Sequence, residues 1–441
     1  MKIYNSYNNK LKWLAKVANL IACILICTWF TLPYFRVRGG VLVLLILFFV
    51  WLTTSELKWL TQKWTWDLVY TLLFFITLTP YLISGNLQYG LAGSKIVTVH
   101  FPLFFVGIFM NHYYMYYKRN YYVLGVIVVT SLIAFTIGSV QTYMGLELNP
   151  LASRILATSV SHFEEEKVKL NQMGVGGFGY IYASGFLFLT LLYFVPKYRF
   201  KLRKIIKGII LVSLTAISFM ILKASYTTVI LIILSGILLV TVVRNKRMLV
   251  LTLVVIFVLI LLIPQSSLGE NILLFSKLFS GNSIVFEKLN DLGTSLLYNI
   301  TTSQTNNRIN LYMQSANTFF NQPLFGIYGP FGNINSSVGG HSGWLDLLAF
   351  YGLFTGVPLV AILYTNFKKH LRVYREDRYY GYLVVIYFLF VVLGFINPVL
   401  YVYEIGFVLF MVVPSVPMIS VEIRSKYLSL RGDKDENFMD Y

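Results

Sequence analysis

NNRINLYMQSANTFFNQPLFGIYGPFGNINSSVGGHSGWLDLLAFYGLFTG, residues 306–356, contains the longest polar interruption in an otherwise apolar chain. The stretch begins polar, carries a lone Arg308, turns through Pro323–Gly326 and reaches His341 before an apolar helix is predicted to begin. Everything before it has the pattern of a membrane scaffold. We therefore expect the segment from Arg308 to His341 to form one half of an active site held against a membrane surface. Smaller loops on the same side should supply the other half.

The composition indicates an all-α polytopic membrane protein. Of 441 residues, 57% are hydrophobic and 12% are charged, whereas a soluble domain carries about 25% charged residues. The net charge of +18 lies in short basic runs between apolar spans, a pattern typical of membrane topology and not of nucleic-acid binding. We expect no metal site and no cofactor. Cys23 and Cys27 lie in an apolar run, and neither a Cys/His cluster nor a GxxxxGK(S/T) nucleotide loop occurs.

Apolar runs of membrane-spanning length recur along most of the chain. A spanning helix needs about 20 apolar residues, or fewer when its flanks reach the interface, and about twelve such runs are present. They are predicted at residues 14–34, 40–55, 66–84, 96–114, 121–141, 176–195, 205–221, 225–243, 248–264, 344–365, 380–396 and 404–420.

Basic residues give these spans an orientation. They precede the first run and follow the second, fourth, sixth, eighth and tenth, so all fall on one side of the membrane, which is the cytoplasmic side. Both termini are therefore predicted to be cytoplasmic. The predicted organisation is nine spans with an external loop at 145–175 (residues 1–264), a large external loop (265–343), three spans (344–420) and a cytoplasmic tail (421–441).

The large external loop has helical patterns of its own. Asn307 is the predicted N-cap of a helix on which Arg308, Tyr312, Ser315 and Phe319 share one stripe. Because the loop is too hydrophobic for a solvated linker, we expect it to lie on the membrane surface or to fold back over the bundle.

Several external cations run against the positive-inside bias, and three of them are the candidates for binding phosphate: Arg308, Arg154 and Lys223. Arginine can grip two phosphate oxygens at once, and a lysine in a tight hairpin at the membrane is costly unless it is paired or functional. The alternatives are a lipid-headgroup contact for Arg308, an ion pair with residues 164–166 for Arg154 and a snorkelling side chain for Lys223.

His341 is the best candidate base, because histidine titrates near neutrality and can accept a hydroxyl proton. It lies among glycines just before a span, although a single histidine is more often structural. Asp346 could orient His341, bind sugar hydroxyls or cap the following helix. Glu404, near the external end of the last span, is a further substrate-binding candidate and the alternative base.

Three motifs in order resemble the O-antigen ligase and Wzy-type polymerase superfamily. They are Arg308 with its amphipathic helix, QPLFGIYG at 322–329, and GGHSGWLDLLAFYGLFTG at 339–356. The family pattern is a basic residue, a Pro-Leu-Phe-Gly turn, and a His with a small polar residue opening a span that contains Gly-Leu-x-x-Gly. The specific match covers residues 306–356, and the twelve-span layout agrees over most of the chain.

The resemblance implies a membrane-embedded, GT-C-like glycosyltransferase of the bacterial cytoplasmic membrane, metal-independent, with its site facing outward. It implies undecaprenyl-pyrophosphate-linked oligosaccharides as substrates, with membrane lipids, a flippase and chain-length regulators as partners. By the same resemblance Arg308 contacts the pyrophosphate and His341 activates the acceptor hydroxyl. The chain departs from the family at Ser225–Tyr226, where Ser-Arg is frequent, and at Ser342, where Asn is frequent.

Within the superfamily, residues 174–182 resemble polymerases that make capsule or exopolysaccharide more than they resemble ligases. Three alternatives remain open: a ligase-type glycan transferase, a flippase or transporter for the same glycolipid, and a non-enzymatic assembly or sensor protein. A transporter predicts paired half-repeats and charges at mid-membrane, and the sequence suggests neither.

Overall fold

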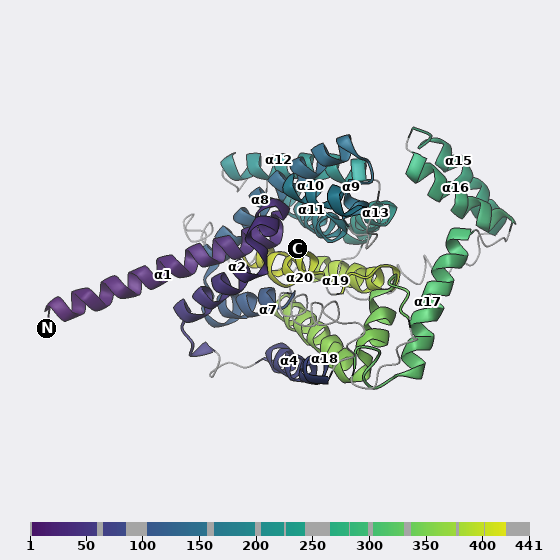
Figure 1. Ribbon diagram of the computed structural model, residues 1–441. Coiled ribbons are helices and arrows are strands. Elements are labelled where there is room, and N and C mark those ends of the chain that lie inside the picture. Colours follow the sequence, from purple (N-terminus) through teal and green to yellow (C-terminus); the bar gives the residue numbers. More distant parts are fainter. Residues whose placement is uncertain are drawn as a thin grey trace.

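The apolar runs form helices that pack side by side into a bundle, and the described part of the chain contains no strand (Figure 1). The bundle helices are α1 (Lys2–Thr31), α2 (Pro33–Thr54), α4 (Trp66–Ser84), α7 (Val106–Asn111) continued by the π-helix η2 (His112–Tyr117), α8 (Tyr121–Leu148), α11 (Phe178–Tyr198), α12 (Lys204–Ala224), α13 (Thr227–Val242), α18 (Gly343–Val373), α19 (Tyr379–Ile396) and α20 (Tyr403–Phe407) continued by η4 (Val408–Val412).

Five further helices lie between the bundle helices. Two short ones follow α8, and three fill the predicted large external loop. They are α9 (Ala152–Ile155), α10 (Glu164–Gln172), α15 (Gln265–Lys277), α16 (Ser283–Tyr298) and α17 (Ser303–Asn321). This computed structural model describes residues 2–59, 65–84, 104–156, 163–198, 204–224, 226–242, 265–281, 283–298, 303–329, 337–375, 379–400 and 402–419.

Six described helices are long and apolar enough to cross a membrane, which confirms the all-helical membrane protein class. Each predicted span contains a described helix except 248–264, which lies outside the described residues. The count of about twelve spans stays a prediction. The six helices are at Trp13–Thr31, Pro33–Thr54, Tyr121–Leu148, Lys204–Ala224, Gly343–Val373 and Tyr379–Ile396.

Helix α2 consists of two helical pieces that meet at Gly40, which has φ 58°. The piece after this break agrees with the span predicted to start at residue 40. The piece before it begins at Pro33, because proline lacks an N–H and is well suited to a first helical turn. The predicted span 344–365 runs on as α18 to Val373. Its last two turns carry Asn366 and His370, which are fully buried because neighbouring helices supply polar partners.

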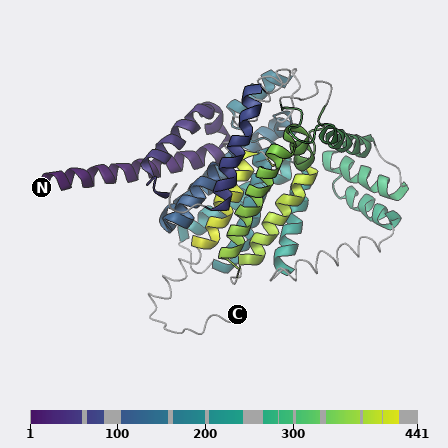
Figure 2. The ribbon, with the colours of Figure 1, turned by 90° about the horizontal axis from the view of Figure 1, so that it is seen from below.

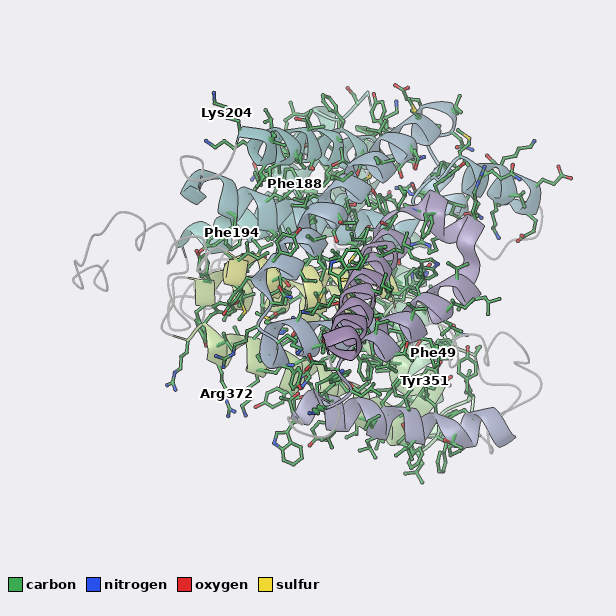
Figure 3. The ribbon with its side chains drawn as sticks, turned by 90° about the vertical axis from the view of Figure 1, so that its left-hand side faces the viewer. Phe49, Phe188, Phe194, Lys204, Tyr351 and Arg372 are labelled. Carbon is green, nitrogen blue, oxygen red and sulfur yellow. The ribbon has the colours of Figure 1, made fainter. Side chains whose placement is uncertain are left out.

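The two ends of the bundle carry different residues. Figure 3 places Lys204 and Arg372, from two of the predicted cytoplasmic loops, at the same end, which we call the basic end. The opposite end is where α18 begins and α19 finishes, since the backbone N–H of Gly343 donates to the carbonyl of Asn397 at 3.1 Å. In Figure 2, α17 lies across this opposite end.

A buried polar cluster joins α4 to α18 near the basic end. The carboxylate of Asp67 pairs with the ammonium of Lys369, and the side-chain amide of Asn366 donates to it at 2.9 Å. Next to this pair, His370 contacts the hydroxyl of Tyr387 at 2.7 Å. Because Asp67 is 1% exposed, its charge depends on these partners rather than on water.

Removing Asp67 should destabilise the protein strongly. In Asp67→Asn the Lys369 ammonium loses its carboxylate while staying largely buried, so we expect a loss of about 3 kcal/mol, measured by unfolding of the full chain in detergent. The exposed pair between Glu56 and Lys118 is the matched control, and Glu56→Gln should cost no more than about 1 kcal/mol. Adding Lys369→Met to Asp67→Asn should restore most of the loss. Equal stability of Asp67→Asn and wild type would contradict this account.

Candidate functional site

His341 lies in a short loop that the first turn of α18 holds in place. The hydroxyl of Ser342 caps α18 by accepting from the N–H of Leu345, at 3.4 Å. The Asp346 carboxylate accepts from the backbone N–H groups of Ser342 at 2.9 Å and Gly340 at 3.3 Å. Both backbone groups flank His341, so Asp346 fixes the backbone on either side of the half-buried imidazole.

The sequence left three roles open for Asp346, and the geometry favours the first. Ser342, and not Asp346, is the N-cap of α18. Asp346 is 0% exposed, so its carboxylate lies away from any sugar at the surface. Its backbone hydrogen bonds instead orient the loop that carries His341.

Helix α17 also holds the loop that carries His341, through hydrogen bonds of Ser315. The hydroxyl of Ser315 donates to Asp346 at 2.6 Å and accepts from the N–H of Gly339 at 3.0 Å. A Cβ atom on Gly339 would lie 2.1 Å from the carbonyl oxygen of Leu311, so only glycine can pass this close to α17. The loop before His341 therefore crosses α17 one helical turn from Arg308.

Arg308 is exposed on the first half of α17. It lies seven residues before Ser315, which is two helical turns, so both belong to one face of the helix, as the sequence predicted. The prediction that Asn307 caps this helix is wrong, because α17 begins at Ser303 and continues through the polar residues before Arg308. Arg308 therefore stands on a regular helix that the His341 loop contacts.

The Pro-Leu-Phe-Gly turn after α17 packs into a break in α18. Gly352 has φ 61°, so α18 consists of two helical pieces that meet there. The N–H groups of Leu353 and Phe354, freed by the break, donate to the carbonyls of Pro323 at 2.8 Å and Leu324 at 3.0 Å. A Cβ on Gly352 would lie 2.3 Å from the Leu324 carbonyl oxygen.

The same turn also supplies hydrogen-bond donors to carbonyl groups of α18 on the other side of the break. The N–H groups of Ile327 and Tyr328 donate to the carbonyls of Ala349 and Phe350, at 3.0 and 3.1 Å. Gly326, with φ 63°, permits this close approach. A broken helix is tolerated within a membrane only where its free backbone groups find partners in the protein. The turn and the Gly-Leu-x-x-Gly motif are therefore two halves of one structural unit.

Arg154 contacts the aromatic side chain of Tyr226, and Lys223 precedes this tyrosine in the chain. The guanidinium of Arg154 is 5.2 Å from the ring centroid of Tyr226, which also packs against Phe178 and Tyr182. Lys223 is exposed at the end of α12, three residues before Tyr226.

The acidic residues after Arg154 have other partners in the structure. The ammonium of Lys167 pairs with Glu164 at 2.6 Å, and Glu166 accepts from the amide of Asn149 at 2.5 Å. The guanidinium of Arg154 forms a cation–π contact with Tyr226. The alternative of an ion pair between Arg154 and this acidic run stays a prediction.

Glu404 forms a buried ion pair with Arg36. Their side chains approach to 2.8 Å, and the Arg36 guanidinium also lies 4.9 Å from the ring centroid of Tyr403. A Cβ on Gly179 would meet Val402 at 2.3 Å and Glu404 at 3.0 Å, so the start of α11 packs closely on this pair. Because the positive charge of Arg36 stabilises the Glu404 carboxylate, Glu404 is poorly suited to accept a proton as a general base.

Arg36 is a residue that the sequence alone left without a role. In the sequence, Arg36 is one of many predicted external cations that run against the charge bias. Its partner, Glu404, lies 368 positions away along the chain. Helix α9, which carries Arg154, is joined to the segment before α11. The hydroxyl of Ser153 donates to the carbonyl of Gly176 at 2.8 Å. Whether Arg308, Arg154 and Lys223 converge on one phosphate stays a prediction.

No protein-family model matches the chain, and a search of curated proteins finds no match. Among the residues that the structure describes, no group of three or more His, Cys, Asp or Glu is placed to hold a metal ion. The described groups at this end include His341, in a loop held by hydrogen bonds, and the cations Arg154, Lys223 and Arg308.

Proposed function

We propose that the chain is a polymerase that joins undecaprenyl-pyrophosphate-linked oligosaccharide repeat units into a surface polysaccharide. The reaction takes place at the outer face of a bacterial cytoplasmic membrane, with both chain termini in the cytoplasm. His341 is the general base, and Arg308 holds the departing pyrophosphate. Arg154 and Lys223 are further phosphate contacts.

One observation carries this proposal. The three motifs that resemble the polymerase superfamily are separate in sequence but packed as one unit. Ser315, on the Arg308 helix, bonds to Asp346, which holds the His341 loop, and the Pro323–Gly326 turn fills the break at Gly352. This packing holds the His341 loop against the helix that carries Arg308, which supports the proposal.

The reaction follows from the chemistry of these groups. A growing glycan on its lipid pyrophosphate is the donor, and a hydroxyl of a lipid-linked repeat unit attacks its anomeric carbon. His341 takes the proton of that hydroxyl as the new C–O bond forms. The bond to the pyrophosphate oxygen breaks with its electron pair, and Arg308 stabilises the negative charge that develops there. Direct attack without a covalent intermediate inverts the anomeric configuration.

The location of unused substrate in cells tests this proposal. In cells that lack the chain, lipid-linked single repeats should accumulate on the outer face of the membrane, where an impermeant glycosidase digests them. A flippase would instead leave them on the cytoplasmic face, protected until lysis. A ligase would leave long lipid-linked polymer and no accumulated single repeats. Either of these last two results would overturn the polymerase assignment.

Substituting Asp346 tests how the His341 loop is held. In Asp346→Asn the side-chain amide presents N–H groups toward the N–H groups of Ser342 and Gly340, so the loop should shift. A displacement of about 1 Å at a catalytic group can cost 10²-fold in rate, and we expect a loss of that size in polymer per molecule of protein. Glu270→Gln, an exposed carboxylate on α15, is the control. Unchanged activity and unchanged proteolysis of the loop would contradict this role.

A further inference from the structure

Helices α15 and α16 form a hairpin that packs on itself. A Cβ on Gly269 would lie 2.6 Å from the backbone nitrogen of Leu297, and one on Gly293 would lie 2.7 Å from Leu273. Two glycines thus let the backbones cross closely, which fixes the inner face of the hairpin. In the described chain the two helices pack extensively on each other and make no extended contact with another helix.

One side of α15 carries a stripe of uncovered apolar side chains. Leu274 and Phe275 on the helix, and Leu278 directly after its end, are 61%, 52% and 77% exposed, and positions 274 and 278 are about one helical turn apart. Glu270 and Lys277 are exposed at the edge of this stripe. A stripe of large apolar side chains with polar flanks is typical of helices that lie in the plane of a membrane surface.

Helix α17 continues the same pattern. Its residues Ile309, Met313 and Phe320 are 47%, 55% and 74% exposed and share one face, opposite to the face that meets the His341 loop. The hairpin and α17 are consecutive in the chain, and both have apolar side chains that no described part of the protein covers. Exposed apolar surface of this extent marks an interaction site rather than a solvated loop.

The position of the hairpin identifies the partner as lipid. It follows directly after the apolar run 248–264, which has the length and composition of a span, so the hairpin begins where the chain leaves the bilayer. Figures 1 and 2 both show α15 and α16 beside the bundle and not stacked on its end. A segment that directly follows a predicted span and lies beside the bundle is expected to meet the membrane interface.

We propose that the α15–α16 hairpin lies in the outer leaflet of the membrane, with Leu274, Phe275 and Leu278 inserted among the acyl chains. Glu270 and Lys277 stay at the headgroups. This anchor holds α17 at headgroup level, so Arg308 meets phosphate at the depth where lipid phosphates lie. The choice of the outer leaflet and the last statement rest on the proposed function, but the insertion of the hairpin into a membrane does not.

The test uses the full chain in lipid vesicles with a fluorescent label on one introduced cysteine. Leu274→Cys places the label in the stripe, and Glu270→Cys is the matched control one turn away. Native Cys23 and Cys27 are buried, and unsubstituted protein measures their background. Helices of this kind lie about 5–10 Å into the headgroup and acyl boundary. The label at position 274 should therefore be quenched several-fold more by shallow spin-labelled lipid than by aqueous iodide. The label at position 270 should be quenched several-fold more by iodide than the label at position 274 is.

Two results would overturn the proposal. Equal quenching by iodide at both positions would place the hairpin in water. Protection of position 274 from both quenchers would mean that protein covers the stripe, either the bundle or a second copy. Leu278→Cys repeats the measurement at a second exposed site if Leu274→Cys alters folding, as judged by its elution and unfolding temperature. None of these readouts depends on polymer formation, so the failure of the proposed function would not affect them.

Discussion

Replacing His341 with glutamine should reduce polymer formation by about 10²–10⁴-fold, the contribution of a positioned general base. Glutamine keeps the size and hydrogen-bonding capacity of the side chain but cannot take the hydroxyl proton. Lipid-linked single repeats should then accumulate. The amount of protein in the membrane should stay normal, because the hydrogen bonds that hold this loop come from Asp346 and Ser315 and not from the imidazole.

A second histidine serves as the control for this substitution. His162 belongs to the external segment at 145–175, and His162→Gln should make polymer at the wild-type rate. If His341→Gln also made polymer at the native rate, the general-base role would be wrong. The pairing of Glu404 with Arg36 and the burial of Asp346 leave neither carboxylate well placed to take over.

Arg308→Ala should lower the rate by about 10²–10³-fold, since removing one group that stabilises a developing oxyanion has effects of this size. Arg308→Lys should recover only part of the loss, because an ammonium is a point charge and cannot bind two phosphate oxygens through a planar fork. The rate of polymer formation by the reconstituted protein measures both.

Lys277→Ala is the matched control for Arg308, because Lys277 is an exposed cation in the same external segment. It should leave the rate close to that of wild type. Full polymer production by Arg308→Ala would remove Arg308 from the site. A rate for Arg308→Lys equal to wild type would show that charge alone is sufficient and that a two-point grip is not used.

Local sequence patterns predicted the helices better than the contacts between them. The apolar run at 66–84 became α4 with the same limits, because length and hydrophobicity alone define such a helix. Helix α18 runs past residue 365 because other helices bury its polar last turns. Helix α17 begins at Ser303, before the predicted cap Asn307.

The assembly of the candidate site could be predicted only in part. Arg308 and His341 were recognisable from the order of motifs, and the seven-residue spacing placed Arg308 and Ser315 on one face. The hydrogen bond from Ser315 to Asp346 and the pair of Arg36 with Glu404 join residues 31 and 368 positions apart. No local pattern encodes such pairs, because each depends on how separate helices pack.

Reconstituted protein given labelled lipid-linked repeat units tests the central claim most directly. The protein alone, without nucleotide or added metal, should convert single repeats into a ladder of longer glycans. Each bond formed should release one undecaprenyl pyrophosphate, and the His341→Gln protein should leave the repeats unchanged. Movement of intact repeats across the membrane with no new glycosidic bond, or a ladder of the same length and rate from His341→Gln, would contradict the account.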